Sequence, residues 1–157
     1  MLFDKGINVI FEELLHALAL DTHLDIHKAI ESGGCTINFD QHINVTFEHH
    51  DNWVYLFSPV MQITHPLSED FFPSLLQIHL FGLATHHCWF GFDAGGQRVL
   101  LFYPLDLESS TPKNAMNRIE TFVDQVQYWQ QNLPNIASAL KPKQEALLTA
   151  ERFKRKW

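Results

Sequence analysis

The sequence predicts an α+β domain in the order α-β-β-β-α-β-β-α, with a twisted, mainly antiparallel sheet flanked by helices. Residues 35–40 and 43–49 alternate apolar and polar side chains with a period of two, which is typical of antiparallel strands with one buried face. Residues 4–20 and 115–133 repeat apolar side chains every three or four positions, which is typical of amphipathic helices. The chain's 157 residues suit one domain of this kind.

The first helix is expected over residues 4–20. Its apolar stripe comprises Ile7, Ile10, Phe11, Leu14, Leu15 and Leu18. Val9 and Leu20 lie off this stripe, so the helix has apolar surface on a second side. The following stretch "LDIHKAIESGG", residues 24–34, reads as a connecting segment that two glycines close.

The third strand, which begins at Trp53, is apolar on both faces. In an extended chain Trp53, Tyr55 and Phe57 point to one side, whereas Val54 and Leu56 point to the other. Both faces therefore need cover, by the core on one side and by a partner chain on the other.

The second helix is expected over residues 71–84. Residues 68–70 precede it as capping candidates, and Pro73 fits its early helical positions. Apolar side chains surround this helix on nearly every side: Leu75, Leu76, Ile78, Leu80, Phe81 and Leu83. Because a monomer of this size has little interior for such a helix, we expect it to form a dimer interface.

A hairpin and a long helix complete the domain. Residues 87–93 and 98–105 are expected to pair as strands across a tight turn whose glycines suit positive φ angles. A hydroxyl cap at Thr111 and a proline in the first turn start the last helix, and Pro134 is expected to stop it. The packing face of this helix comprises Ala115, Ile119, Phe122, Val126, Trp129 and Leu133.

Charge divides the chain into a body and a tail. Residues 141–157 carry six Lys/Arg and two Asp/Glu, a net of +4, whereas residues 1–140 carry five and sixteen, a net of −11. The sequence therefore predicts a single domain over 1–140 and a basic C-terminal tail over 141–157. The acidic body argues against nucleic acid as the partner, because phosphate binding needs a basic face. It favours a basic or neutral partner chain.

Signals for a membrane, a secretory route or a cofactor are not visible in the sequence. No apolar run approaches the roughly 18 residues that span a bilayer, so we expect no membrane insertion. The N-terminus lacks a basic segment leading into an apolar one, and two cysteines are too few for a disulfide framework. A cytoplasmic protein without a cofactor is the expectation.

The densest cluster of reactive side chains is "HHCWFGF", which begins at His86. On a strand, His86 and Cys88 project to one face and His87 to the other, so a metal ion would need a further ligand, such as His49 or His50. Cys88 shares its face with two phenylalanines, which is typical of a buried structural cysteine. We therefore expect no catalytic residue and no metal site. The alternative is a small metal- or thiol-dependent enzyme centred on His86 and Cys88.

This order of elements in a small acidic chain resembles the class I chaperones of bacterial type III secretion, the Tir-chaperone (CesT-like) family. The resemblance covers about residues 5–133 and rests on "FEELLHALAL", "CTINFD", "INVTFEHHDNWVYLFSPV", "FFPSLLQIHLFGLA", "CWFGFDAGGQRVLLFYPLDL" and "RIETFVDQVQYWQQNL". A leucine-rich helix followed by "G-F-D" and then by "V-L-L" is a pattern similar to that of the family.

The resemblance implies a non-catalytic homodimer in the cytoplasm of a Gram-negative bacterium. Without ATP, it would bind the N-terminal segment of one or more secreted effector proteins and keep them soluble and competent for export. The secretion ATPase or export apparatus is a further implied partner. A chaperone-like regulator that binds another regulatory protein is an alternative.

The same analogy assigns residues to two surfaces. It centres the dimer interface on Leu76, Leu80, Leu83 and Trp89. It places cargo contacts at Val9, Val45, Trp53, Tyr55 and Phe57. For each residue, an ordinary place in the core is the rival interpretation.

Overall fold

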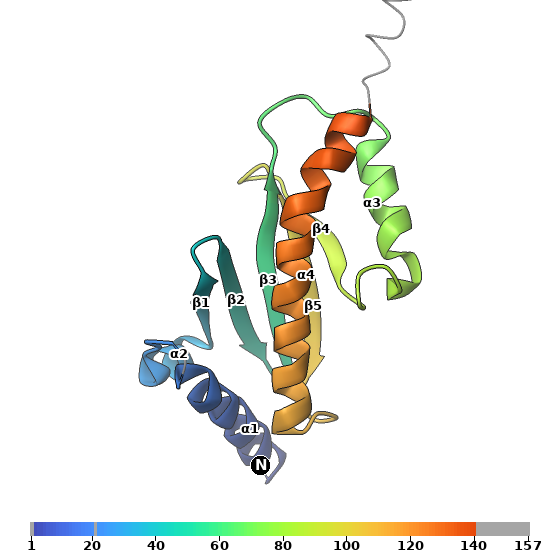
Figure 1. The fold of residues 1–157 in the computed structure, drawn as a ribbon. Coiled ribbons are helices and arrows are strands. Elements are labelled where there is room, and N and C mark those ends of the chain that lie inside the picture. The colour runs from blue at the N-terminus through green and yellow to red at the C-terminus, as the bar shows by residue number, and fades with distance from the viewer. Residues whose placement is uncertain (1, 21, 141–157) are drawn as a thin grey trace, which may run out of the picture.

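A computed structural model describes residues 2–20 and 22–140, with side chains from Phe11 onward in those ranges. Its elements are α1 (Leu2–Ala19), α2 (Ile26–Ser32), β1 (Gly34–Asp40), β2 (Ile43–His50), β3 (Trp53–Gln62), α3 (Phe71–His79), the 3₁₀ turn η1 (Leu80–Gly82), β4 (Trp89–Asp93), β5 (Arg98–Asp106) and α4 (Pro112–Ala139) (Figure 1). The predicted α+β class and the order of the main elements are confirmed. The predicted tail, 141–157, lies outside the described residues.

The five strands form one antiparallel sheet in the order β1-β2-β3-β5-β4. The meander β1–β3 and the hairpin β4–β5 are joined where β5 pairs with β3. The chain between these two strands contains α3 and η1, so the hairpin returns to the sheet beyond the meander. β1 and β4 are consequently the two edge strands.

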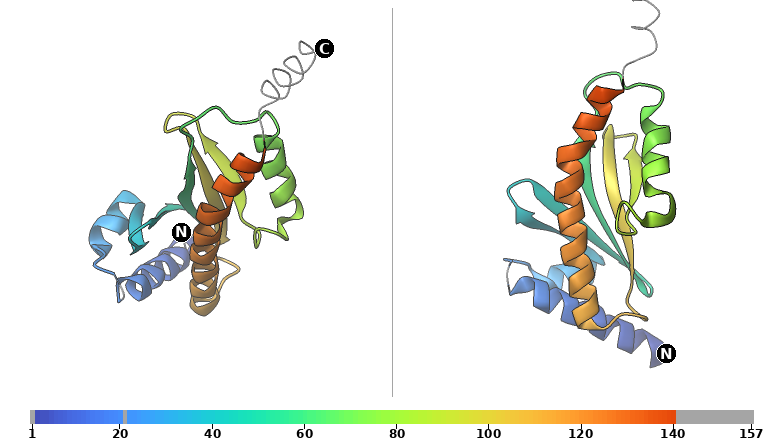
Figure 2. Two further views of the ribbon diagram at one scale, coloured as in Figure 1. Left: turned by 45° about the horizontal axis from the view of Figure 1, so that its top comes forward. Right: turned by 45° about the vertical axis from the view of Figure 1, so that its right-hand side comes forward.

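The helices gather on one face of the sheet. α4 lies along β3, α1 packs against α2 and α4, and α3 lies beside β4, as the views in Figures 1 and 2 agree. The core between the sheet and the helices includes Phe11, Leu15, Phe47, Leu56, Leu101, Ile119 and Phe122. Across the described ranges, no helix covers the opposite face, which we call the bare face.

Helix α4 begins as the sequence predicts but ends later. The Thr111 side chain accepts a hydrogen bond from the Asn114 backbone N–H at 3.2 Å, and all six predicted core-facing residues are buried. The prediction that Pro134 ends the helix is wrong, because the helix continues to Ala139. A proline inside a helix costs about 3 kcal/mol. Packing of the last turn, including Ile136, against the core offsets this cost.

A short helix occupies the segment that the sequence analysis takes as a connection. The Asp25 carboxylate accepts a hydrogen bond from the Lys28 N–H at 3.2 Å and caps α2. Gly33, at φ 71°, ends the helix in the left-handed conformation. Seven residues give too few turns for a helical period to be visible in the sequence, whereas Ala29 anchors the helix in the core.

The predicted second helix is shorter than expected. α3 ends at His79, and Phe81 and Gly82 adopt positive φ angles of 67° and 71° that turn the chain back toward the sheet. A Cβ at position 82 would lie 2.8 Å from Nδ1 and 3.0 Å from Cα of His87. Only glycine therefore fits this turn without displacing its neighbours.

The strand predicted from His87 starts two residues later. His86 and His87 have φ angles of 49° and 64°, which are incompatible with a strand. The His87 N–H donates to the Gly82 carbonyl at 2.8 Å, and the Thr85 hydroxyl donates to the Cys88 carbonyl at 2.6 Å. This pair of turns directs Cys88 into the core before β4 begins at Trp89.

The β4–β5 turn is confirmed, but its glycines serve another purpose. The residue with positive φ is Gln97, at 50°, and not either of the glycines at 95 and 96. A Cβ at Gly96 would lie 2.6 Å from Nε of Arg98, which pairs with Asp93 across the turn at 2.6 Å. Glycine at position 96 therefore leaves room for this ion pair.

Candidate partner-binding surfaces

The two faces of β3 differ in what covers them. Val54 and Leu56 are fully buried beneath the helices, as the alternation of the sequence predicts. Trp53, Tyr55 and Phe57 lie on the bare face, where Trp53 is 40% exposed and the other two are partly exposed. The predicted cover from a partner chain is thus needed on one face of the central strand.

Aromatic side chains from three strands gather on the bare face and form what we call the aromatic stripe. It comprises Trp53, Tyr55, Phe57, Phe102 and Trp89. Tyr55 and Phe102 stack with 5.7 Å between ring centroids, and Phe102 and Trp89 stack at 6.1 Å. His50 of β2 extends the stripe, with its ring 5.8 Å from that of Tyr55.

Sequence reasoning missed Phe102 and His50 as members of this surface. The signal for Phe102 was present, because "RVLLFYPL" is apolar on both faces in the same way as the third strand. The signal for His50 required the register, which places it opposite Trp53. β5 pairs with β3 in place of β4, the next strand in the sequence, and this strand order brings these rings together.

One of the predicted cargo residues does not contribute to the aromatic stripe. Val45 has no exposed area and belongs to the core, because β2 turns it toward the helices. The structure therefore supports the alternative interpretation, in which Val45 is a core residue and not a cargo contact. Val9 is part of α1, but its side chain lies outside the described residues.

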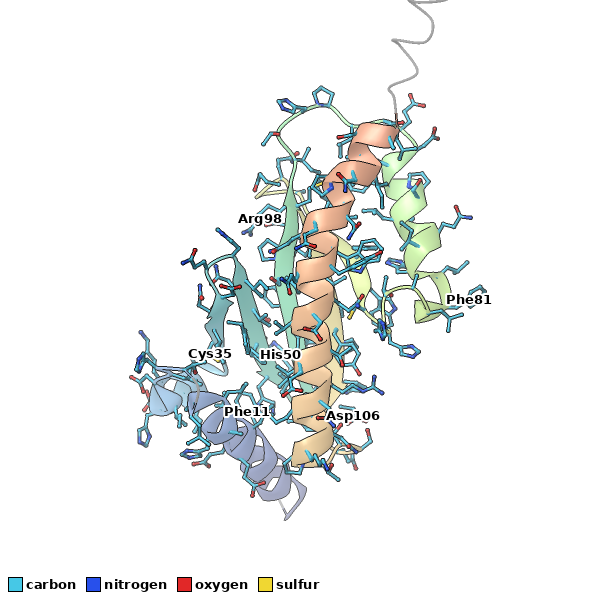
Figure 3. All side chains as sticks on the ribbon, in the orientation of Figure 1. Phe11, Cys35, His50, Phe81, Arg98 and Asp106 are labelled. Atoms are coloured by element: carbon cyan, nitrogen blue, oxygen red, sulfur yellow. The ribbon has the colours of Figure 1, made fainter. Side chains whose placement is uncertain are left out.

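A second apolar surface, which we call the α3 patch, lies on α3, η1 and the residue after it. It comprises Leu76, Leu80, Phe81 and Leu83, which are 61%, 57%, 81% and 81% exposed. Figure 3 shows Phe81 at the outer margin of the molecule, away from the sheet. Residues 71–84 contain no Asp, Glu, Lys or Arg. The patch is therefore apolar, and the segment that carries it contains no ionisable side chain other than His79.

Trp89 lies on the sheet, whereas the three leucines predicted to share the dimer interface with it lie on α3, on η1 and directly after η1. Trp89 is 46% exposed on the bare face, while its neighbour Phe90 points to the helix face and packs on Trp129. Leu76 and Leu80 belong to the α3 patch, on elements that lie beside the edge strand β4. Trp89 thus belongs to the aromatic stripe and sits at the edge nearest the α3 patch.

The two edges of the sheet differ in accessibility. At the β4 edge the Phe90 N–H donates to Nδ1 of His79 at 2.9 Å, and the two rings stack at 5.7 Å. Burial lowers the pKa of His79, which favours the neutral ring that this hydrogen bond requires. At the other edge, next to β1, lies a cavity of about 290 Å³ whose lining includes Leu18, Phe39, Met116 and Val123.

The cluster around Cys88 is structural. The Cys88 side chain is 1% exposed, and burial, partly offset by the charge of Arg118, raises the pKa of its thiol to about 12. His86 and His87 are exposed in the turn, while His49 stacks on Phe11 and lies on β2, which β3 and β5 separate from β4. Within ranges 2–20 and 22–140, no group of three or more His, Cys, Asp or Glu side chains could hold a metal ion.

Burial also raises the pKa of the other cysteine, Cys35, to about 11. Neither thiol is therefore an activated nucleophile near neutral pH. The prediction that Cys88 behaves as a small buried hydrophobe is confirmed. In the same described ranges, no helix is long and apolar enough to cross a membrane.

Comparison with solved structures identifies the fold. A chain of the ExsC–ExsE complex superposes with a TM-score of 0.63 at 22% identity, over 83% of this chain and 95% of that chain. The HopA1–SchA chaperone–effector complex gives a TM-score of 0.59 at 11% identity, over 79% and 95%. The ExoU–SpcU complex from the type III secretion system of Pseudomonas aeruginosa gives 0.52 at 11% identity, over 64% and 79%.

Comparison with sequences identifies the family. No curated protein matches the chain with significant similarity. The model of the Tir chaperone protein (CesT) family, however, matches residues 13–130, which span α1 to α4 and include both the aromatic stripe and the α3 patch. The predicted resemblance is confirmed, and the chain belongs to the Tir chaperone (CesT) family.

Proposed function

We propose that this chain is a type III secretion chaperone that binds the N-terminal segment of one or more effector proteins. The observation that carries the proposal is the aromatic stripe, a group of partly exposed rings on a sheet face that no described helix covers. Membership of a chaperone family and likeness to folds found in chaperone–effector complexes support it. An extended apolar segment laid over the stripe removes these rings from water.

The α3 patch is proposed to bind a second copy of the chain. Four large apolar side chains, each more than half exposed, favour burial against a protein surface. A symmetric interface places the same patch on both subunits, so a charge-free patch avoids opposing like charges. Leu76, Leu80 and Leu83 form the centre of this interface, with Trp89 at its border.

The β1 edge offers a second contact for the bound segment. Its backbone groups are open to an added strand, whereas the β4 edge is occupied in part by His79. The lining of the cavity beside β1 is more apolar than polar, although it includes Glu120 and Asp124, and the cavity accepts a side chain from that strand. Main-chain hydrogen bonds then supply affinity, and the cavity selects an apolar residue at one position.

In this role the chain acts in the cytoplasm by binding, without catalysis, cofactor or ATP. It keeps the effector's N-terminal segment extended and screens its apolar residues until transfer to the secretion ATPase or export apparatus. The effector segment loses conformational entropy when it becomes ordered on the chaperone. This loss weakens the complex and so permits release.

Co-purification with matched variants tests the proposal. The wild-type chain, recovered from its host, is expected to hold a secreted protein whose N-terminal segment is protected from proteolysis. Trp53→Ala removes a side chain at the stripe and should weaken that complex about tenfold or more, as for an interface aromatic. Tyr128→Ala, which removes a 50% exposed ring on α4, is the control and should leave binding unchanged.

The identity of the bound protein separates the two roles that the fold can serve. A bound protein that is exported supports a secretion chaperone. A bound protein that stays in the cell and controls transcription or secretion instead supports a chaperone-like regulator. Equal recovery with Trp53→Ala and Tyr128→Ala contradicts the assignment of the stripe.

A further inference from the structure

One end of the aromatic stripe combines exposed rings with carboxylates. It lies next to the β2–β3 turn and comprises Trp53, Tyr55, Glu48 and Asp106; we call it the acidic end. Glu48 is directly opposite Tyr55 in the β2–β3 register. Asp106 is directly opposite Trp53 in the β3–β5 register.

Alternation of the strands places both carboxylates on the bare face. Leu105 and Leu107, on either side of Asp106, are buried beneath the helices, so Asp106 faces the other way. Phe47 is likewise buried, and its neighbour Glu48 has a side chain that is 51% exposed. Directly opposed side chains in an antiparallel pair lie roughly 5 Å apart at Cβ, so each carboxylate borders a ring.

Within the described ranges, no lysine or arginine side chain neutralises the charge of this end. Glu48 contacts His50 at 3.6 Å, and Asp106 accepts hydrogen bonds from the Glu108 N–H and the Ser109 hydroxyl. Among the ion pairs in ranges 2–20 and 22–140, neither carboxylate is joined to a lysine or arginine. At the opposite end of the sheet the carboxylate of Asp93 is paired with Arg98, so its charge is balanced.

We propose, on the basis of the proposed function, that the acidic end binds an arginine side chain of the effector segment. A guanidinium stacks on an aromatic face and donates hydrogen bonds to carboxylates in its plane, so it matches both components of this site. A lysine offers a point charge and matches them less well. The segment therefore carries an arginine between apolar residues that cover the rest of the stripe.

A second copy of the chain does not suit this site. Two bare faces in contact would bring two acidic ends onto one interface, or set them against a body with a net charge of −11. The α3 patch carries no such charge and is the surface that suits self-association. The charge of the acidic end thus selects a basic segment of another protein.

Binding of four labelled peptides tests this inference. Each is a 15-residue probe that alternates leucine and serine and carries arginine, lysine, glutamine or glutamate at its centre. Fluorescence anisotropy should show arginine binding roughly five- to tenfold more tightly than glutamine, with lysine between them and glutamate weakest. The double variant Glu48→Gln/Asp106→Asn should reduce the ratio of arginine to glutamine affinity to about one.

A matched control separates a local site from general attraction to an acidic protein. Glu12→Gln/Glu31→Gln removes the same number of charges from exposed positions in α1 and α2, on the helix side of the sheet. This control should keep the arginine preference. Loss of the preference in the control to the same extent would overturn the inference in favour of long-range electrostatics.

The failures of the inference and of the proposed function are distinguishable. Equal affinity for arginine and glutamine peptides, with both lost in Trp53→Ala, overturns the arginine site and leaves the stripe as a cargo surface. Unchanged binding of all peptides to Trp53→Ala overturns both. A fall in the molar mass of Trp53→Ala by light scattering shows a second copy on the bare face and also overturns the arginine site.

Discussion

The indole of Trp89 lies over the ring of Phe102, with 6.1 Å between the ring centroids and 21° between the ring planes. Phe102 also stacks on Tyr55 at 5.7 Å, so the edge strand β4 and the central strand β3 share one aromatic surface. The same edge strand borders the α3 patch. The surface proposed for the cargo therefore reaches the edge strand beside which the surface proposed for a second copy lies.

The α3 patch is tested by placing a charge at its centre. Leu80→Asp should convert a dimer to a monomer, because a carboxylate in an apolar interface loses its hydration. Light scattering coupled to size-exclusion chromatography gives the mass. Leu20→Asp, at an 87% exposed leucine after α1, is the control and should leave the mass unchanged. A wild-type chain that is monomeric at micromolar concentration contradicts this interface.

Val45 is expected to support the fold and not the cargo. Val45→Ala removes two methyl groups from a fully buried site and should destabilise the protein by about 2 kcal/mol. Urea unfolding measures the change, and binding of the cargo segment below the unfolding transition should be unaltered. A weaker complex with unchanged stability would restore Val45 as a contact residue.

The turn after α3 should depend on the glycine at its centre. Gly82→Ala introduces a Cβ at φ 71° that meets His87, and we expect a loss of roughly 1–3 kcal/mol in the free energy of unfolding. Gly91→Ala is the matched control, since a Cβ there has no atom within 4 Å. A similar melting temperature for Gly82→Ala and Gly91→Ala is the result that this account excludes.

The buried thiol of Cys88 predicts the direction of a pH effect. Burial raises its pKa from 9.0 to about 12, so above pH 9 the unfolded chain loses this proton before the folded chain does. The contribution of the protonated Cys88 thiol to the free energy of unfolding is complete below pH 9 and is lost as the pH rises toward 12. In Cys88→Ala the fall in stability over this window should be smaller than in the wild type. At pH 8, a thiol reagent should label Cys88 only at the rate of unfolding.

The repeating patterns of the sequence predicted the regular elements well. The period of α4 identified all six of its core-facing residues, because each of them packs against the same sheet. The limits of the elements were harder to predict. The helix passes through Pro134 because tertiary packing outweighs the local cost of proline, and α2 is too short for its period to be visible.

Three of the five residues of the aromatic stripe followed from the third strand alone. Its apolar residues on two faces predicted Trp53, Tyr55 and Phe57 on a side that lacks cover. Phe102 joins them because β5 pairs with β3, and strand order is not encoded in a local pattern. Trp89 was predicted to lie in the dimer interface, but the face it occupies depends on where β4 starts, which the left-handed residues at 86 and 87 determine.

Site-specific photocrosslinking in the host tests the central claim most directly. A photoreactive phenylalanine analogue is placed at Phe57 in the aromatic stripe or, as a control, at Tyr128 on α4, and the crosslinked peptides are identified by mass spectrometry. We predict that position 57 crosslinks to the N-terminal segment of a secreted protein and that position 128 does not. Crosslinks from position 57 only to a second copy of the chain, or to the secreted protein only from position 128, would contradict the account.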